Sequence, residues 1–308
     1  MQDARVVVFG YGRPALAALS TLDDLGVQPA AVVVPGNRSG SDVEIVSGTA
    51  AARGLPLLVQ PPRRELAPFL ESLARLKPDV LLVWSYSMLL PPAVIALASR
   101  GAVNVHGGLL PEYRGGHVMN WAIINGETES AATLHYLDAG IDTGPIVATE
   151  RFAIASADDA ASVQRHLEAA GRSLLRAWWP AVAAGTAPKT PQDESRARYY
   201  PMRTAEDGRI DWTQPNMRIH NLARALVAPW PGAFSSLAGR KLVVRRTQPS
   251  DSDGTAAPPG TVLRLDGDQV LVACGVGRLR LLAVEVDGRR AGEAELRSAG
   301  VRSDARFE

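Results

Sequence analysis

The sequence predicts an α/β protein with a doubly wound, mostly parallel sheet, followed by a smaller β-rich domain. Roughly the first 155 residues alternate short apolar segments with helical patterns, which is typical of a parallel sheet covered by helices on both faces. Beyond about residue 205, short β-type segments are separated by glycines, as in a small barrel. The length of 308 residues agrees with two domains.

Continuous apolar segments predict the strands of the first domain. These strands are expected at Arg5–Phe9, Gln28–Val34, Leu57–Val59, Val80–Trp84, Ala102–Val105, Ala131–Tyr136 and Pro145–Phe152. Helical patterns are found at Pro14–Leu25, Asp42–Arg53, Glu65–Leu76, Pro91–Ala98 and Val118–Asn125. A longer helix begins at Asp158 and Asp159, and we expect Pro180 to kink or end it.

The segment Gly185–Arg203 is rich in Pro, Thr and charged residues and shows no periodicity. We therefore predict a first domain at residues 1–190, a linker at 191–205 and a second domain at 206–308. The second domain is expected to contain a helix at Met217–Leu226 and strands at Leu242–Arg246, Thr261–Leu265, Gln269–Cys274 and Leu279–Val286.

Composition and charge exclude several kinds of protein. Lys and Arg total 33 and Asp and Glu total 32, which gives a net charge of +1. The protein as a whole is therefore not basic enough to attract nucleic acid or an anionic membrane by its net charge. Cys274 is the only cysteine, which excludes an internal disulfide and favours a reducing, cytoplasmic compartment. The uncharged stretch Val80–Ser99 could cross a bilayer by length, but Pro91 and Pro92 would break a helix there. No membrane insertion is expected.

Several catalytic and cofactor motifs are missing. No lysine follows a glycine as a phosphate-binding loop requires, and no Gly-x-Ser-x-Gly or His-Glu-x-x-His motif occurs. The histidines form no close pair in the sequence, so no metal is expected. The turn Gly10–Ala15 matches a loose dinucleotide fingerprint, but no acidic residue ends the second strand to hold a ribose. A tight structural turn is favoured there, and a nicotinamide-binding protein is the alternative.

Asn104 and His106 are the most informative residues for chemistry. They lie two residues apart at the end of a predicted buried strand, so their side chains point to the same face. Ligands bind at the carboxyl ends of such strands, where an amide can donate to an oxyanion and a histidine can transfer a proton. Asp142, after a glycine-rich loop, could orient the histidine. On spacing alone, a catalytic pair and a pair that only satisfies loop backbone both remain open.

Longer motifs surround these residues. They are Asn-x-His-Gly-Gly-Leu-Leu-Pro-x-Tyr-Arg-Gly at 104–115, Trp-Ala-Ile-x-x-Gly-Glu-Thr at 121–128, Leu-Asp-x-Gly-Ile-Asp-Thr-Gly at 137–144, Arg-Thr-x-Glu-Asp-Gly-Arg-Ile-Asp-Trp at 203–212 and Pro-Trp-Pro-Gly-Ala-Phe at 229–234. Through them, nearly the whole chain resembles the 10-formyltetrahydrofolate-dependent formyltransferases, a family that includes methionyl-tRNA formyltransferase. Among its members the chain is most similar to the formyltransferase half of the bifunctional enzyme acting on UDP-4-amino-4-deoxy-L-arabinose.

This resemblance implies a Rossmann-like catalytic domain, an OB-like C-terminal barrel, and transfer of a formyl group from 10-formyltetrahydrofolate to a primary amine without a metal. It assigns Asn104 to stabilising the oxyanion, His106 to proton transfer, and Asp142 to orienting and charging that histidine. It also implies a pterin pocket between two segments, formed by Met88, Leu89, Leu90, Asp138, Ala139, Gly140 and Ile141.

We predict a small-molecule acceptor, a nucleotide-linked 4-amino sugar, in preference to tRNA. Binding tRNA calls for a basic stripe, whereas the loop Pro35–Asp42 carries only Arg38 and Asp42 as charged residues. Basic residues do cluster at Arg240–Lys241 and Arg245–Arg246. Methionyl-tRNA therefore remains an alternative acceptor.

The chain departs from the family pattern near the expected acceptor site. Gly108 replaces a usual serine, and Gly116–Val118 stands where the family commonly has a proline. An amino-acid acceptor such as N-hydroxyornithine, and a catalytically silent folate- or nucleotide-binding protein, are further alternatives. Substrate contacts are expected from Tyr11, Arg114 and His117, whereas His135, on a strand, is interpreted as structural.

Overall fold

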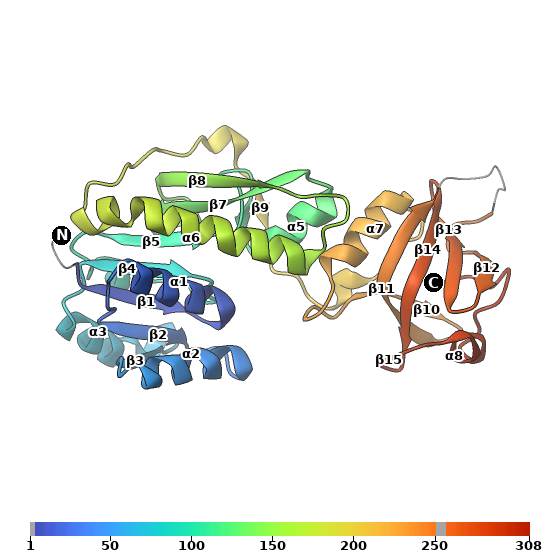
Figure 1. The fold of residues 1–308 in the computed structure, drawn as a ribbon, viewed down its shortest axis with the longest axis horizontal. Coiled ribbons are helices and arrows are strands. Elements are labelled where there is room, and N and C mark those ends of the chain that lie inside the picture. The colour runs from blue at the N-terminus through green and yellow to red at the C-terminus, as the bar shows by residue number, and fades with distance from the viewer. Residues whose placement is uncertain (1–3, 251–256) are drawn as a thin grey trace. The chain divides into compact units, whose positions relative to one another are not determined.

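The computed structural model describes residues 4–250 and 257–308, which form two compact units (Figure 1). One unit contains the chain up to Val118 together with Glu129–Ala153 and Arg165–Tyr200. The other contains Met119–Thr128, Ile154–Gln164 and Pro201–Glu308. The second unit thus includes two segments from within the expected first domain. The division into 1–190, 191–205 and 206–308 stays a prediction.

A seven-stranded sheet forms the centre of the first unit (Figure 1). Its order is β3 (Leu57–Gln60), β2 (Ala31–Pro35), β1 (Val6–Gly10), β4 (Val80–Trp84), β5 (Ala102–His106), β7 (Glu129–Tyr136) and β8 (Ile146–Ala153). The first five strands in this order are parallel, whereas β7 is antiparallel to β5 and to β8. The predicted α/β fold with a mostly parallel sheet is confirmed.

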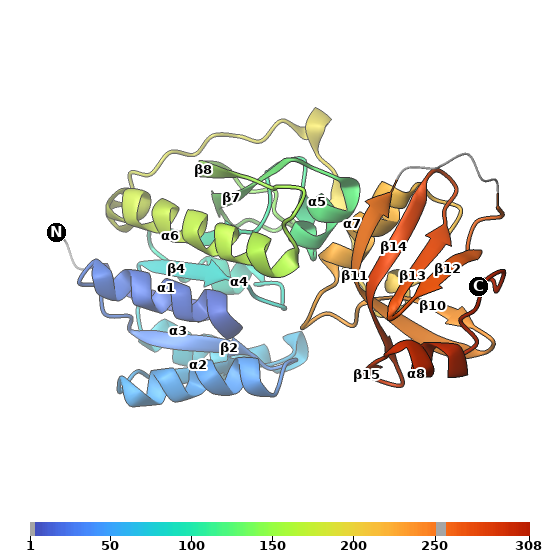
Figure 2. The ribbon, with the colours of Figure 1, turned by 45° about the vertical axis from the view of Figure 1, so that its right-hand side comes forward.

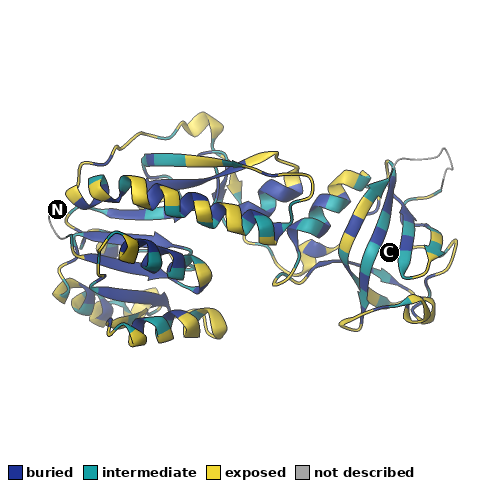
Figure 3. Ribbon diagram, in the orientation of Figure 1, coloured by how far each residue is buried: buried dark blue, intermediate teal, exposed yellow. Residues whose placement is uncertain are grey.

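Helices cover both faces of this sheet because its strands are apolar on both sides. Alternate residues of β1 and β4, including Val7, Phe9 and Leu81, join one apolar cluster with α3 (Leu66–Arg75) and α4 (Pro92–Ile95). The opposite face is covered by α1 (Gly12–Asp24), α2 (Ser41–Ala52) and α6 (Ala160–Ala184), as Figure 2 shows. In Figure 3 the central strands β1, β2 and β4 are buried, whereas the helices keep exposed outer faces.

Gly10 has a structural role in the turn that follows β1. A Cβ on this residue would lie 2.7 Å from the Trp84 carbonyl oxygen and 2.8 Å from the Ala15 Cβ. The glycine therefore allows β1, β4 and α1 to approach one another closely. This packing supports the structural interpretation of the Gly10–Ala15 turn.

The second unit is built around an antiparallel sheet. Its strand order is β10 (Ala233–Leu237), β11 (Arg240–Ser250), β14 (Arg278–Val286), β13 (Gln269–Ala273) and β12 (Val262–Asp266), with β15 (Arg289–Arg290) beside β14. The helices α5 (Val118–Asn125), α7 (Asn216–Ala225) and α8 (Glu293–Ser298) add to the fold. Trp212 and Phe307 stack in the core with ring centroids 5.3 Å apart. The expected C-terminal β domain is confirmed.

Two details differ from the sequence expectation. The helix α6 continues through Pro180 as far as Ala184, so the proline does not end it. The polar segment after α6 is also ordered by specific contacts: Thr190 pairs with Ile146, and β9 (Tyr199–Tyr200) pairs with β6 (Arg114–Gly115). Within the described residues, no helix has the length and apolar character needed to span a membrane.

Gly171 offers a test of how α6 supports the strands that carry the candidate site. A Cβ there would lie 2.6 Å from Trp84 Cη2 on β4 and 3.0 Å from Val105 Cγ1 on β5. We predict that Gly171→Ala lowers the free energy of unfolding by about 1–3 kcal/mol, because overpacking outweighs alanine's better helix propensity. Urea denaturation measures this change.

Gly48 is the matched control, since it lies on the exposed side of α2 with no atom within 4 Å of an added Cβ. Gly48→Ala should raise the free energy of unfolding by about 0.5–1 kcal/mol. A stabilising effect of Gly171→Ala as large as that of Gly48→Ala would contradict the described packing.

Candidate active site

The candidate site lies at the carboxyl end of β5, beside the junction between the parallel and antiparallel parts of the sheet. His106 is buried and Asn104 is half-buried. Antiparallel pairing with β7 places Asn104 opposite His135 and His106 opposite Thr133. The pairing register therefore brings together polar residues from two strands that are distant in the sequence.

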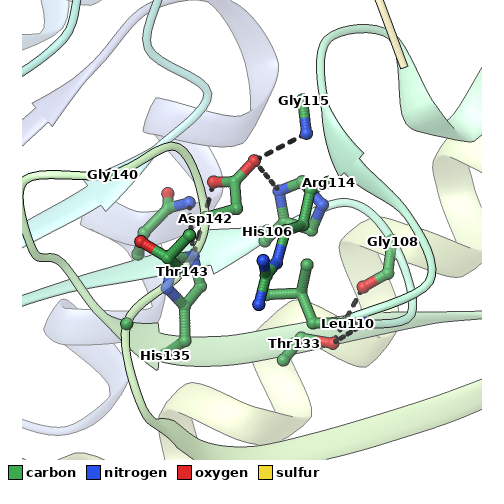
Figure 4. Close-up of polar contacts among 12 residues, drawn as sticks. His106, Gly108, Leu110, Arg114, Gly115, Thr133, His135, Gly140, Asp142 and Thr143 are labelled. Carbon is green, nitrogen blue, oxygen red and sulfur yellow. Dashed lines mark hydrogen bonds and ion pairs between the residues drawn. The ribbon is translucent and has the colours of Figure 1, made fainter. Parts of the chain in front are cut away.

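Asp142 lies between two imidazoles (Figure 4). Its Oδ2 is 3.6 Å from His106 Nδ1, and its Oδ1 is 3.7 Å from His135 Nε2. The backbone N–H of Gly115 donates to Oδ2 at 2.9 Å. Asp142 itself has a φ of 55°, in the left-handed region that aspartate tolerates better than most residues. One carboxylate is thus held against both rings by a fixed loop.

His135 is fully buried, and its hydrogen bonds define one tautomer. Its Nδ1 lies 2.8 Å from the carbonyl oxygen of Tyr136, so Nδ1–H donates there. The neutral ring then has an acceptor at Nε2, which lies 3.1 Å from Asn104 Nδ2 and accepts an amide hydrogen. Burial lowers the pKa of His135 to about 4, and the nearby Asp142 carboxylate offsets only part of that effect. A neutral His135 therefore fixes which way the Asn104 amide points.

His106 lies between two oxygen atoms. Its Nε2 is 2.6 Å from the carbonyl oxygen of Tyr113, and its Nδ1 faces Asp142. A protonated ring can donate to both oxygens, whereas a neutral ring can donate to only one. This position suits a group that holds and releases a proton.

The segments expected to form a pterin pocket contain exposed apolar side chains. Leu89 is 69% exposed and Ile141 is 47% exposed. The buried Gln60 amide donates to the Leu89 carbonyl oxygen, and its Oε1 has no partner among the described residues. Exposed apolar side chains on two such segments could pack against the faces of a flat ring.

The remaining residues of the expected folate loop have different positions. Asp138 accepts hydrogen bonds at Oδ1 from the Gly140 N–H and the Thr143 hydroxyl, so this carboxylate shapes the turn. Ala139 and Gly140 are exposed, while Met88 and Leu90 are half-buried after β4. Their contact with folate stays a prediction.

The three expected substrate contacts are also in different environments. The Arg114 side chain is fully buried, and its guanidinium is engaged by Gln192, Glu194 and Tyr199 rather than directed to solvent. His117 is half-buried with a φ of 52°. Tyr11 is half-buried under the Arg38 guanidinium, which lies 5.0 Å from its ring centroid. Protein groups thus engage the Arg114 guanidinium, and contact of Arg114, His117 and Tyr11 with substrate stays a prediction.

Sequence inspection missed His135 as a site residue and Gln192 altogether. His106, His135 and Asp142 bring three potential metal-ligand atoms within 4.8 Å of one another. Thus the fold creates the histidine pair that the sequence spacing lacks. The expectation that no metal takes part stays a prediction.

Comparison with known proteins connects this geometry to a family. The Formyl transferase model matches residues 25–177, and the model of the Formyl transferase, C-terminal domain, matches residues 203–300. The methionyl-tRNA formyltransferase of Myxococcus xanthus (strain DK1622) is 37% identical over 294 residues, which cover 94% of this chain and 93% of that protein. The chain belongs to the formyl transferase family.

Solved structures share the fold. One is the N-formyltransferase from Helicobacter canadensis in complex with folinic acid and dTDP-3-aminofucose, with a TM-score of 0.71 at 17% identity. The matched region covers 94% of this chain and 100% of that one. The sugar 3N-formyl transferase WlaRD has a TM-score of 0.71 at 16% identity, with the same coverage. At these identities the likeness establishes the fold alone.

Family membership identifies the chain as an enzyme, a 10-formyltetrahydrofolate-dependent formyltransferase. This confirms the enzyme class expected from the motifs. The expected nucleotide-linked sugar is supported less well than the methionyl-tRNA alternative, because the relative at 37% identity is a methionyl-tRNA formyltransferase.

A neutral, buried His135 predicts how stability depends on pH. In the unfolded chain, the His135 imidazole has an ordinary pKa of about 6.5. In the folded protein, its pKa is about 4. Protonation therefore favours the unfolded state, and the contribution of a neutral His135 is present above about pH 6.5 and lost as the pH falls toward 4.

We expect the wild type to lose more stability than His135→Asn between about pH 7 and about pH 5, because the variant removes this titration. Urea denaturation of both proteins at each pH measures the difference. Equal losses in the two proteins would contradict a depressed pKa for His135.

Proposed function

We propose that Asn104, His106 and Asp142 form the catalytic centre of this formyltransferase. The observation that carries the proposal is the single carboxylate held between two imidazoles, one of which orients the Asn104 amide. Of the two amide hydrogens of Asn104, one faces His135, and the other can donate to an oxygen of the substrate.

10-Formyltetrahydrofolate supplies the activated formyl group. Asn104 donates its amide hydrogen to the formyl oxygen as the attacking amine places negative charge there. His106 supplies a proton to the departing folate nitrogen and accepts one from the amine. Asp142 keeps the His106 ring oriented.

We propose methionyl-tRNA as the acceptor. Support comes from the 37% identity with the Myxococcus xanthus methionyl-tRNA formyltransferase, which extends through both domains. The second unit also carries exposed cationic side chains on β11 at Lys241 and Arg246, and such groups suit phosphate contacts. The net charge of +1 means that any tRNA site must depend on local clusters of this kind.

A nucleotide-linked amino sugar is the second candidate acceptor. It is favoured by the Pro35–Asp42 segment at the end of β2 and the start of α2, in which Arg38 and Asp42 are the only charged residues. The Gly116–Val118 segment, with His117 in the left-handed region, also makes the loop after β6 unusual for the family pattern.

Single substitutions test the catalytic centre. Asn104→Ala and His106→Ala should each lower turnover by about 100-fold or more, the usual loss when an oxyanion donor or a proton-transfer group is removed. Formyl transfer from 10-formyltetrahydrofolate gives the measurement. His166→Ala is the matched control, since His166 is exposed on α6, and it should leave turnover unchanged. Full activity of His106→Ala would refute the proposed mechanism.

Salt dependence distinguishes the two acceptors. With methionyl-tRNA, we expect efficient formylation and a KM for tRNA that rises more than about tenfold between roughly 50 and 200 mM salt, because phosphate contacts release counterions. Lys241→Glu and Arg246→Glu should raise this KM without changing the KM for 10-formyltetrahydrofolate. Turnover with UDP- or dTDP-linked 4-amino sugars, and none with tRNA, would instead establish the second candidate.

A further inference from the structure

A buried arginine connects the loop after β5 to the polar segment after α6. Arg114 Nη1 donates to Glu194 Oε2 at 2.9 Å and to the Tyr199 hydroxyl at 2.9 Å. Its Nη2 donates to Glu194 Oε1 at 2.6 Å and to Gln192 Oε1 at 2.8 Å, and its Nε also reaches Gln192 Oε1, at 3.1 Å. This fixed, planar set of donors determines where the Gln192 side chain lies.

The other end of the Gln192 amide contacts the catalytic loop. Its Nε2 donates to the carbonyl oxygen of Asp142 at 2.8 Å and to that of Gly144 at 2.7 Å. Both hydrogens of the amide are thereby used on the loop, while its oxygen is used on Arg114. Gln192 is the side chain that joins the arginine to the backbone of the aspartate.

A second connection reaches the same aspartate from the same arginine. Gly115, the residue after Arg114, donates its backbone N–H to Asp142 Oδ2. The strand pair β6–β9 holds Arg114 and Gly115 against Tyr199 and Tyr200. Asp142 is thus fixed at its carboxylate by one connection and at its carbonyl by the other.

We propose that Gln192 is a positioning residue for Asp142, which sets the angle at which the carboxylate meets His106. This inference rests on the catalytic role of Asp142 given under the proposed function. The loop has a left-handed backbone at Asp142 and close packing at Gly144. Gln192 donates a hydrogen bond to the carbonyl oxygen of each of these two residues. Arg114 acts through Gln192, since its guanidinium is engaged by Gln192, Glu194 and Tyr199.

Gln192→Glu separates this role from a general structural one. The variant keeps an acceptor for Arg114 and the same shape, but it replaces the two donors with an oxygen facing two carbonyl oxygens. We expect only a small fall in Tm, because two hydrogen bonds are lost while the new carboxylate pairs with Arg114. The kcat should fall between about 10-fold and about 100-fold, as for a displaced catalytic group. The KM for methionyl-tRNA should stay within about twofold, since both hydrogens of this amide are used within the protein.

Glu194→Gln is the matched control. It keeps a hydrogen-bond acceptor for Arg114, and its side chain is 68% exposed and does not reach the Asp142 loop. Its kcat should equal that of the wild type within about twofold. A loss as large as that of Gln192→Glu would overturn the assignment to Gln192.

A double-mutant cycle with Asp142→Asn gives the decisive comparison. If Gln192 acts through Asp142, adding Gln192→Glu to Asp142→Asn lowers kcat by less than about twofold. If the two losses multiply, the positioning role is wrong while the catalytic role of Asp142 stands. Full turnover of Asp142→Asn alone would overturn the proposed catalytic centre itself. Each rate is measured with 10-formyltetrahydrofolate and methionyl-tRNA, or with the amino-sugar nucleotide if that acceptor replaces it.

Discussion

The carboxylate of Asp142, held between the imidazoles of His106 and His135, is the constraint on which the candidate site depends. Burial of His135 lowers its pKa and keeps that ring neutral, although the Asp142 carboxylate lies beside it. The neutral ring then has a free acceptor for the Asn104 amide. The ring centroids of His106 and His135 are only 6.0 Å apart, but their different environments give them different roles.

The fold supplies this constraint through three connections of different kinds. The register between β5 and β7 places Asn104 opposite His135, and α6 packs closely on β4 and β5 where Gly171 allows it. The polar segment after α6 reaches the Asp142 loop through Gln192 and the buried Arg114. Each connection uses backbone geometry or complete hydrogen bonding, so little freedom is left for the catalytic groups.

Much of the fold could be predicted from the sequence, because continuous apolar strands separated by amphipathic helices report local structure directly. Asn104 and His106 could be predicted as candidates for the same reason, since a two-residue spacing on a strand determines the shared face. The role of His135 could not, because pairing register between β5 and β7 leaves no local pattern. Gln192 was hidden in a segment without periodicity, and its role depends on side-chain hydrogen bonds that leave no sequence pattern. The burial of Arg114 depends on the same contacts.

Formyl transfer at the carboxyl end of β5 can be tested with a crystal structure in complex with 5-formyltetrahydrofolate, the stable isomer of the formyl donor. We expect a pterin ring between the Met88–Leu90 segment and the Asp138–Asp142 loop, with the formyl-bearing side of the folate within hydrogen-bond distance of Asn104 Nδ2 and the His106 ring. Folate bound at another site, with Asn104 and His106 out of reach, would contradict this position for the reaction.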